Sequence, residues 1–168
     1  MDRLRPLAPD VAWVGRDDVH LTLKFLGGVE AGRLDAVTGA LAGAVAGRPA
    51  FDLAVSGLGA FPSPARPRVL WAGVGEGAGA AGALAGLIDE ALAPLGFPRE
   101  TRPFSAHVTL GRVRTPRTDR RLAEALAAGG PVGRQRLGHV SLMRSELSPR
   151  GARYTELAAL PLALEPAG

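Results

Sequence analysis

Alternating apolar and polar residues predict several β-strands along the chain. Between Val19 and Leu26 the sequence VHLTLKFL alternates, so that His20, Thr22 and Lys24 would lie on one strand face. Leu21, Leu23 and Phe25 would lie on the other. Further extended patterns cover residues 51–58, 68–74 and 105–113, and a last strand pair covers 137–144 and 153–160.

Apolar residues at helical spacing predict three helices between these strands. The first covers 32–46, the second is marked by apolar residues between 84 and 92, and the third covers 118–128. The mixture of helices and strands predicts an α+β fold.

An approximate internal repeat is more informative than any single element. HLTL at 20–23 returns as HVTL at 107–110, and each copy precedes a helix, a strand, a proline-containing turn and another strand. The residue before the turn proline lies 41 positions after the histidine in both copies, at Phe61 and at Ser148. The repeat predicts one domain over 1–168, built of two similar sheet-and-helix lobes with pseudo-two-fold symmetry. The two histidine strands would face each other across a central groove.

The two copies differ in what precedes them. A strand and a helix (68–94) come before the second histidine strand, whereas only 19 residues come before His20. The first lobe is therefore expected to lack its N-terminal strand and helix. We expect a monomer, with dimerisation or strand exchange as the alternative if a sheet edge is left exposed.

Composition narrows the classes of chemistry. The chain has no cysteine, which excludes disulfides, thiolate nucleophiles and cysteine-based zinc sites. Its net charge of +4 is carried almost entirely by arginine, which suits phosphate recognition but is also what a GC-rich genome encodes. There is no apolar run of about 20 residues and no secretory signal pattern, so no membrane partner is expected and the cytoplasm is the expected location.

The duplicated H-x-T motif carries the candidate chemistry. Two histidines can cleave a phosphodiester without a metal, because an imidazole has an unperturbed pKa of about 6.5 and can take or give a proton near neutral pH. A residue two places on shares the strand face, so Thr22 and Thr109 can direct hydroxyls at the phosphate. His139 lacks the motif and is interpreted as structural or surface.

The motifs HLTLKFLG and HVTLGRVR resemble those of the 2H phosphoesterases, in particular the RNA 2′,3′-cyclic phosphodiesterases also called 2′-5′ RNA ligases. The likeness extends from about Trp13 through Leu162. It implies a bilobal fold, no metal or cofactor, and hydrolysis of the cyclic phosphate to a 2′-phosphomonoester. It also implies that His20 protonates the leaving 3′ oxygen and that His107 activates water, although pseudo-symmetry leaves these roles open from the residues alone. Members usually begin with an additional strand and helix, so the short N-terminus suggests a misplaced start, a lost strand or a strand from another chain.

Other residues have two interpretations each. The counterpart of Arg112 in the family lies near the phosphate, but its odd offset from His107 places it on the opposite face unless the strand bends. Lys24 would add charge to the substrate site or reach solvent. The arginines between 112 and 121 would hold an RNA backbone or form a solvated loop, and four aromatic residues would stack on bases or pack in the core: Trp13, Phe61, Phe104 and Tyr154.

Three alternatives to cyclic phosphate hydrolysis stay open. The chain could bind RNA without turnover, or it could join RNA ends through a 2′-5′ bond or cleave 2′-5′ linkages. A zinc hydrolase is disfavoured because no H-E-x-x-H spacing occurs. The expected partners are RNA with 2′,3′-cyclic phosphate ends or small cyclic nucleotides.

Overall fold

The computed structural model describes residues 4–115, 118–148 and 151–163, and its chain divides into two compact units. The first, which we call the sheet unit, consists of Met1–Leu21, Ala54–Glu76 and Ala106–Arg134. The second, which we call the hairpin unit, consists of Thr22–Leu53, Gly77–Ser105 and Gln135–Gly168. The units therefore interleave along the chain, and neither corresponds to one copy of the repeat.

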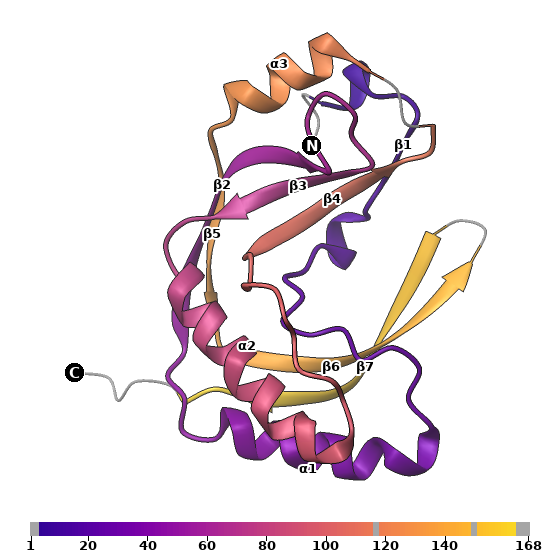
Figure 1. Ribbon diagram of the computed structural model, residues 1–168. Helices are drawn as coiled ribbons and strands as arrows, with labels where there is room; N and C mark the ends of the chain where they lie inside the picture. The colour runs from indigo at the N-terminus through magenta and orange to yellow at the C-terminus, as the bar shows by residue number, and fades with distance from the viewer. Residues whose placement is uncertain (1–3, 116–117, 149–150, 164–168) are drawn as a thin grey trace. The chain divides into compact units, whose positions relative to one another are not determined.

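Five strands form one sheet, most of it in the sheet unit (Figure 1). Its order is β1-β4-β3-β2-β5, with β1 at Val11–Trp13, β2 at Phe51–Phe61, β3 at Val69–Val74, β4 at His107–Val113 and β5 at Pro131–Leu137. β4 pairs antiparallel with both β1 and β3, and β3 pairs antiparallel with β2. The hairpin of β2 and β3, which follows the first H-x-T motif in the sequence, thus pairs with β4, the strand that carries the second motif.

Helix α3 (Arg120–Ala128) packs with one face of this sheet. Asp119 caps the helix by accepting a hydrogen bond from the backbone N–H of Leu122 at 3.0 Å, as expected for an acidic residue at this position. Buried residues of the sheet, the helix and the N-terminal segment form one core cluster, which comprises Leu4, Ala8, Val11, Ala60, Leu70, Ala72, Leu110, Leu122 and Leu126. The opposite sheet face carries His107, Thr109 and Trp71.

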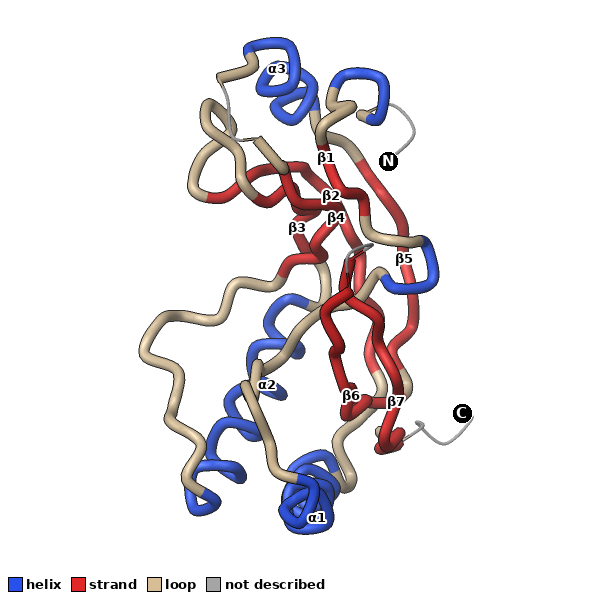
Figure 2. The backbone as a smooth tube through the Cα atoms, turned by 90° about the vertical axis from the view of Figure 1, so that its right-hand side faces the viewer, coloured by secondary structure: helices blue, strands red, loops and turns tan. Residues whose placement is uncertain are grey.

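The hairpin unit contains helices α1 (Leu34–Val45) and α2 (Ala78–Leu92) and the hairpin of β6 (His139–Ser148) and β7 (Gly151–Pro161) (Figure 2). Its core comprises Val37, Leu41, Val45, Ala50, Leu84, Ile88, Leu92, Phe97, Leu142, Leu160 and Leu162. Four short 3-10 segments complete the described structure, at Arg5–Leu7, Arg16–Asp18, Ala31–Arg33 and Ala93–Leu95.

The stretch Ala78–Leu95 is long and apolar enough to span a membrane by length and composition alone. That test is weak for one helix, because a core helix passes it as well. α2 buries Leu84, Ile88 and Leu92 in the core of the hairpin unit and carries two acidic residues, Asp89 and Glu90. We therefore interpret it as a core helix.

The structure confirms the α+β class and all three predicted helices. The strands predicted at 51–58, 68–74, 105–113, 137–144 and 153–160 correspond to β2, β3, β4, β6 and β7. Two strands were not predicted: β1 has only three residues, and β5 is exposed at every residue except Leu137, so neither has a buried alternating face.

The strand predicted over Val19–Leu26 is wrong. Within that segment only Leu21 makes a β-bridge, to Val108, because β4 begins at His107 and offers no strand with which the residues after Thr22 could pair. A bend at Leu23 follows and ends the alternation. Phe25, expected inside, is 77% exposed.

Candidate active site

β4 presents His107 and Thr109 on the sheet face away from α3. Val108, between these two residues, and Leu110, directly after Thr109, are buried. This is the alternation expected of a strand with one face in the core. On β3, Gly73 pairs with His107 and Trp71 pairs with Thr109. The second H-x-T motif is therefore held on a central strand of the sheet.

A β-bulge brings Arg112 to this same face. The β3–β4 register shifts between Leu70, which pairs with Gly111, and Trp71, which pairs with Thr109, so that Leu110 is an extra residue. Beyond the shift Arg112 pairs with Val69, and Val69 and Trp71 share a strand face. The odd offset of Arg112 from His107 is compensated by the bulge, which is the bend that the sequence interpretation required.

Two aromatic rings surround the His107 imidazole. The Phe61 ring meets it edge-on at 5.3 Å between centroids, and the Trp71 ring lies 6.4 Å away. Phe61 and Trp71 are themselves 5.4 Å apart. The position opposite Trp71 on β2 is Gly59, where the methyl carbon of an alanine would lie 2.2 Å from the indole ring. A glycine thus makes room for the ring that flanks the histidine.

His20 reaches β4 through the bridge between Leu21 and Val108. Paired residues share a face and their neighbours take the other face, so His20 and His107 lie on the same side of β4. His20 stands one residue from the bridge, beside the stretch of β4 that carries His107 and Thr109. The structure therefore brings both predicted histidines together with Thr109 and Arg112 in the sheet unit.

A backbone carbonyl orients the His20 ring. Nδ1 of His20 lies 2.7 Å from the carbonyl oxygen of Asp18. A carbonyl oxygen can only accept, so Nδ1 carries hydrogen and Nε2 is the nitrogen at which the ring gains or loses a proton. This is the arrangement that a general acid or base requires.

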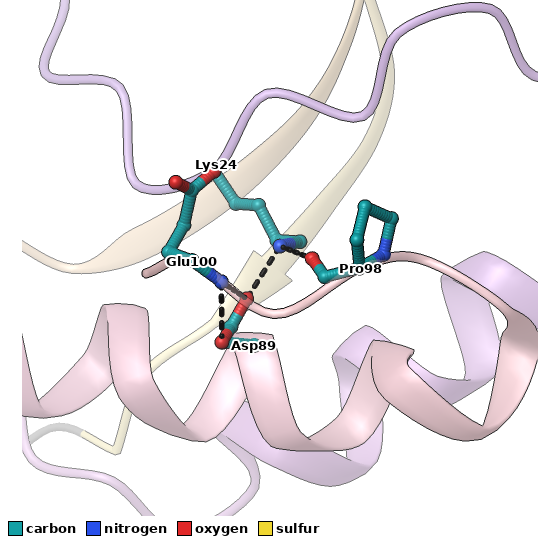
Figure 3. Close-up of polar contacts among 4 residues, drawn as sticks. All are labelled: Lys24, Asp89, Pro98 and Glu100. Carbon is teal, nitrogen blue, oxygen red and sulfur yellow. Dashed lines mark hydrogen bonds and ion pairs between the residues drawn. The ribbon is translucent and has the colours of Figure 1, made fainter. Parts of the chain in front are cut away.

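Thr22 and Lys24 belong to the hairpin unit, because the unit boundary falls inside the first motif, between Leu21 and Thr22. Thr22 is exposed. Lys24 is not on an exposed face with it: its side chain is 4% exposed, and its ammonium group contacts Asp89 and the carbonyl of Pro98 (Figure 3). The expectations that Lys24 shares a face with His20 and Thr22 or reaches solvent are therefore wrong.

The remaining candidates are placed as follows. His139 is exposed at the start of β6, in agreement with a surface role. Trp13 packs against the core of the sheet unit with Arg5 5.7 Å above its ring, and the side chain of Phe104 lies close to Gly82 on α2. Phe61, in contrast, is 40% exposed. Arg112, Arg114, Arg120 and Arg121 are exposed, Arg120 pairs with Glu124, and Arg117 lies outside the described residues.

Three features of the site were missed by sequence reasoning. The ring pair around His107 depends on cross-strand neighbours far apart in the chain, and the bulge at Leu110 has no clear local signal. Asp89 did have a signal, since it stands in the apolar stretch GLIDEAL of a core helix. Among the described residues no group of three or more His, Asp or Glu side chains could hold a metal ion.

Comparison with protein families decides the family. The family model described as the 2′-5′ RNA ligase superfamily matches residues 1–149. This chain belongs to that superfamily. The resemblance that the two H-x-T motifs indicated is thereby confirmed.

Relatives within the 2′-5′ RNA ligase superfamily cover most of the chain. The RNA 2′,3′-cyclic phosphodiesterase of Methanothermobacter thermautotrophicus is 35% identical over 163 residues, which are 96% of this chain and 88% of that protein. The crystal structure of TT0787 of Thermus thermophilus is 26% identical, covers 98% of this chain and 88% of its own, and has a TM-score of 0.82. E. coli LigT in complex with 3′-AMP is 28% identical, with coverages of 96% and 88% and a TM-score of 0.74.

Proposed function

We propose that this chain hydrolyses the 2′,3′-cyclic phosphate at RNA ends to a 2′-phosphomonoester, without a metal and with His20 and His107 as the acid–base pair. The observation that carries the proposal is the placement of both imidazoles on one side of β4, beside Thr109 and Arg112. The relatives named RNA 2′,3′-cyclic phosphodiesterase and the LigT complex with 3′-AMP support the same substrate class.

The residues present can perform each proton transfer of such a reaction. One neutral imidazole takes a proton from water as the water oxygen bonds to phosphorus, and the other, as imidazolium, protonates the ribose 3′ oxygen as its bond to phosphorus breaks. Nε2 of His20 suits the donor role that the resemblance implies for it, with His107 as the base. Hydroxyls of Thr22 and Thr109 and the guanidinium of Arg112 would bind the phosphate oxygens.

Charge distribution also supports a polyanionic substrate. The sheet unit has eleven arginines and seven acidic residues, whereas the hairpin unit balances nine basic against nine acidic residues. The entire net charge of +4 thus belongs to the unit that contains both histidines. A positive field of this kind raises the rate of encounter with RNA.

We propose three further properties of the protein. The equal spacing of the repeat supports a pseudo-two-fold relation between the motifs with a groove between the lobes. Phe61, with its exposed ring beside His107, is the best placed of the four aromatics to stack on a base. The cytoplasm is the proposed location.

Product analysis tests the proposed reaction. Incubation with cytidine 2′,3′-cyclic phosphate and with an RNA that ends in a cyclic phosphate should give the 2′-phosphomonoester, and the rate should survive exhaustive chelation. Formation of a 3′-phosphomonoester would contradict the leaving-group assignment, and loss of activity on chelation would contradict the metal-free mechanism. An intact protein that binds the RNA without turnover would favour the binding module, and conversion to 2′-5′ joined RNA would favour end joining.

Replacing Thr109 or Thr22 by Val should slow turnover by about tenfold, less than loss of a histidine, because each change removes one hydrogen bond to the phosphate. Val keeps the β-branched shape, so the fold should be unaffected. Steady-state kinetics with the cyclic nucleotide measure the effect. A double Thr22→Val, Thr109→Val variant with unchanged kinetics would remove both residues from the site.

A further inference from the structure

A polar network in the hairpin unit ties three segments of the chain together (Figure 3). Nζ of Lys24 donates to Oδ1 of Asp89 on α2 and, at 2.9 Å, to the carbonyl oxygen of Pro98. The carboxylate of Asp89 also accepts the backbone N–H of Glu100 at 3.1 Å. The network thus joins the segment after the first H-x-T motif, the helix α2 and the turn after that helix.

This pair is well shielded from water. Lys24 is the only lysine of the chain, and its side chain is 4% exposed, against 16% for Asp89. Lysine is rarely buried without a charged partner, since desolvation of an ammonium group is costly. Removal of either partner would leave the other charge uncompensated.

The Asp89 carboxyl group is ionised over the whole neutral range. The hydrogen bond from Lys24, followed by the N–H of Glu100, lowers the pKa of Asp89 from its ordinary value of 3.8, although burial acts in the opposite direction. A lowered carboxyl pKa contributes stability above that ordinary value, and the contribution is lost as the pH falls through the lowered pKa. At the neutral pH of an assay, therefore, Asp89 is a carboxylate that can accept the hydrogen bond from Lys24.

The residues around Lys24 also contact the hairpin unit. Leu23 and Leu26 pack against the core of the hairpin unit, whereas Thr22 is exposed. At the other end of this loop the Arg33 guanidinium donates to the carbonyl of Leu95 and lies 5.0 Å above the Phe97 ring. The loop from 23 to 33 is therefore anchored at both ends to the C-terminal part of α2 and the turn beyond it.

We propose that Lys24 is a positioning residue that holds Thr22 in place through its ion pair with Asp89, and that it does not bind the substrate. The inference rests on the proposed function, in which Thr22 contacts the phosphate. Two of the three ammonium hydrogens are engaged by Asp89 and Pro98 within a shielded side chain, so Lys24 is not presented to a phosphate. Thr22, two residues earlier, is the nearest exposed member of the motif.

A double-mutant cycle separates positioning from phosphate binding. Lys24→Met and Asp89→Asn should each lower kcat by about tenfold with KM changed less than about threefold, and the double variant should be no worse than either single one. A phosphate-binding lysine would instead raise KM in Lys24→Met and leave Asp89→Asn active. Either that pattern or a Lys24→Met variant with normal kcat would overturn the inference.

Coupling to Thr22 distinguishes positioning from a general loss of stability. Thr22→Val should cost less in the Lys24→Met background than in the wild type, whereas the cost of Thr109→Val should be the same in both. Equal costs of Thr22→Val in both backgrounds would contradict the proposal. Arg144→Gln, which breaks an exposed pair with Glu146 in the same unit, is the matched control and should behave as wild type.

Backbone NMR order parameters give a readout independent of activity. In Lys24→Met the order parameters of residues 22–26 should fall below about 0.6, the range of flexible backbone, whereas those of β6 and β7 should stay near about 0.85. If Lys24→Met does not fold, Lys24→Arg and Asp89→Asn are measured in its place. An inactive wild type would contradict the proposed function, whereas unchanged order parameters in residues 22–26 would contradict the positioning role, so the two failures are distinct.

Discussion

Replacing either His20 or His107 by Ala should reduce hydrolysis of a cyclic nucleotide by at least about a hundredfold, the usual scale for loss of a general acid or base. The physical reason is that each imidazole performs one proton transfer. Without one of them, either the attacking water keeps its proton or the 3′ oxygen leaves as an alkoxide. Steady-state kinetics at neutral pH measure the loss. Circular dichroism should show an unchanged fold for His20→Ala, because His20 is exposed.

The third histidine provides the matched control. His139 is exposed on β6 and lies in the hairpin unit, so His139→Ala should retain wild-type kinetics. A comparable loss from His139→Ala, or a His107→Ala variant with near-normal turnover, would refute the acid–base assignment.

Gly59→Ala should both destabilise the protein and reduce its activity. The added methyl carbon would lie 2.2 Å from the Trp71 ring, so the indole must move, and overpacking of this kind costs about 1–3 kcal/mol of unfolding free energy. Nε1 of Trp71 is buried and finds no acceptor among the described residues, so packing alone fixes the ring. Its displacement should disturb His107 and lower kcat by about tenfold to a hundredfold, since small misplacements of a catalytic group are costly.

The control for this change is another strand glycine of the sheet unit. Gly133 on β5 has nothing within 4 Å of the position of a methyl carbon, so Gly133→Ala should leave stability within about 1 kcal/mol of wild type and turnover unchanged. Urea unfolding and steady-state kinetics measure both variants. A Gly59→Ala protein as stable and as active as the Gly133→Ala protein would show that the Trp71 ring does not constrain the site.

The placement of His107 and Thr109 on one strand face could be predicted from sequence, because it depends on a local motif. The H-x-T pattern needs only strand alternation to place His107 and Thr109 together, and β4 has that alternation. The duplicated motif also indicated the family correctly. The α+β class followed from the apolar periodicity of elements such as α1 and β3.

Features set by distant partners could not be predicted in this way. The face of Arg112 depends on a bulge that only the β3 register reveals, and the environment of Lys24 depends on Asp89, 65 positions away. Alternation alone made Lys24 a neighbour of His20 and put Phe25 inside, whereas the ion pair and the bend at Leu23 reverse both assignments. Periodicity describes a regular strand, and it fails where a tertiary contact interrupts the strand.

The interleaving of the two units bears on how the protein can be made. β1 pairs with residues of β4 that come about a hundred positions later in the sequence. The complete sheet therefore cannot form until more than half of the polypeptide has left the ribosome. A chain divided between β3 and β4 would separate β1 from its partner strand, so the sheet unit depends on both parts of the polypeptide.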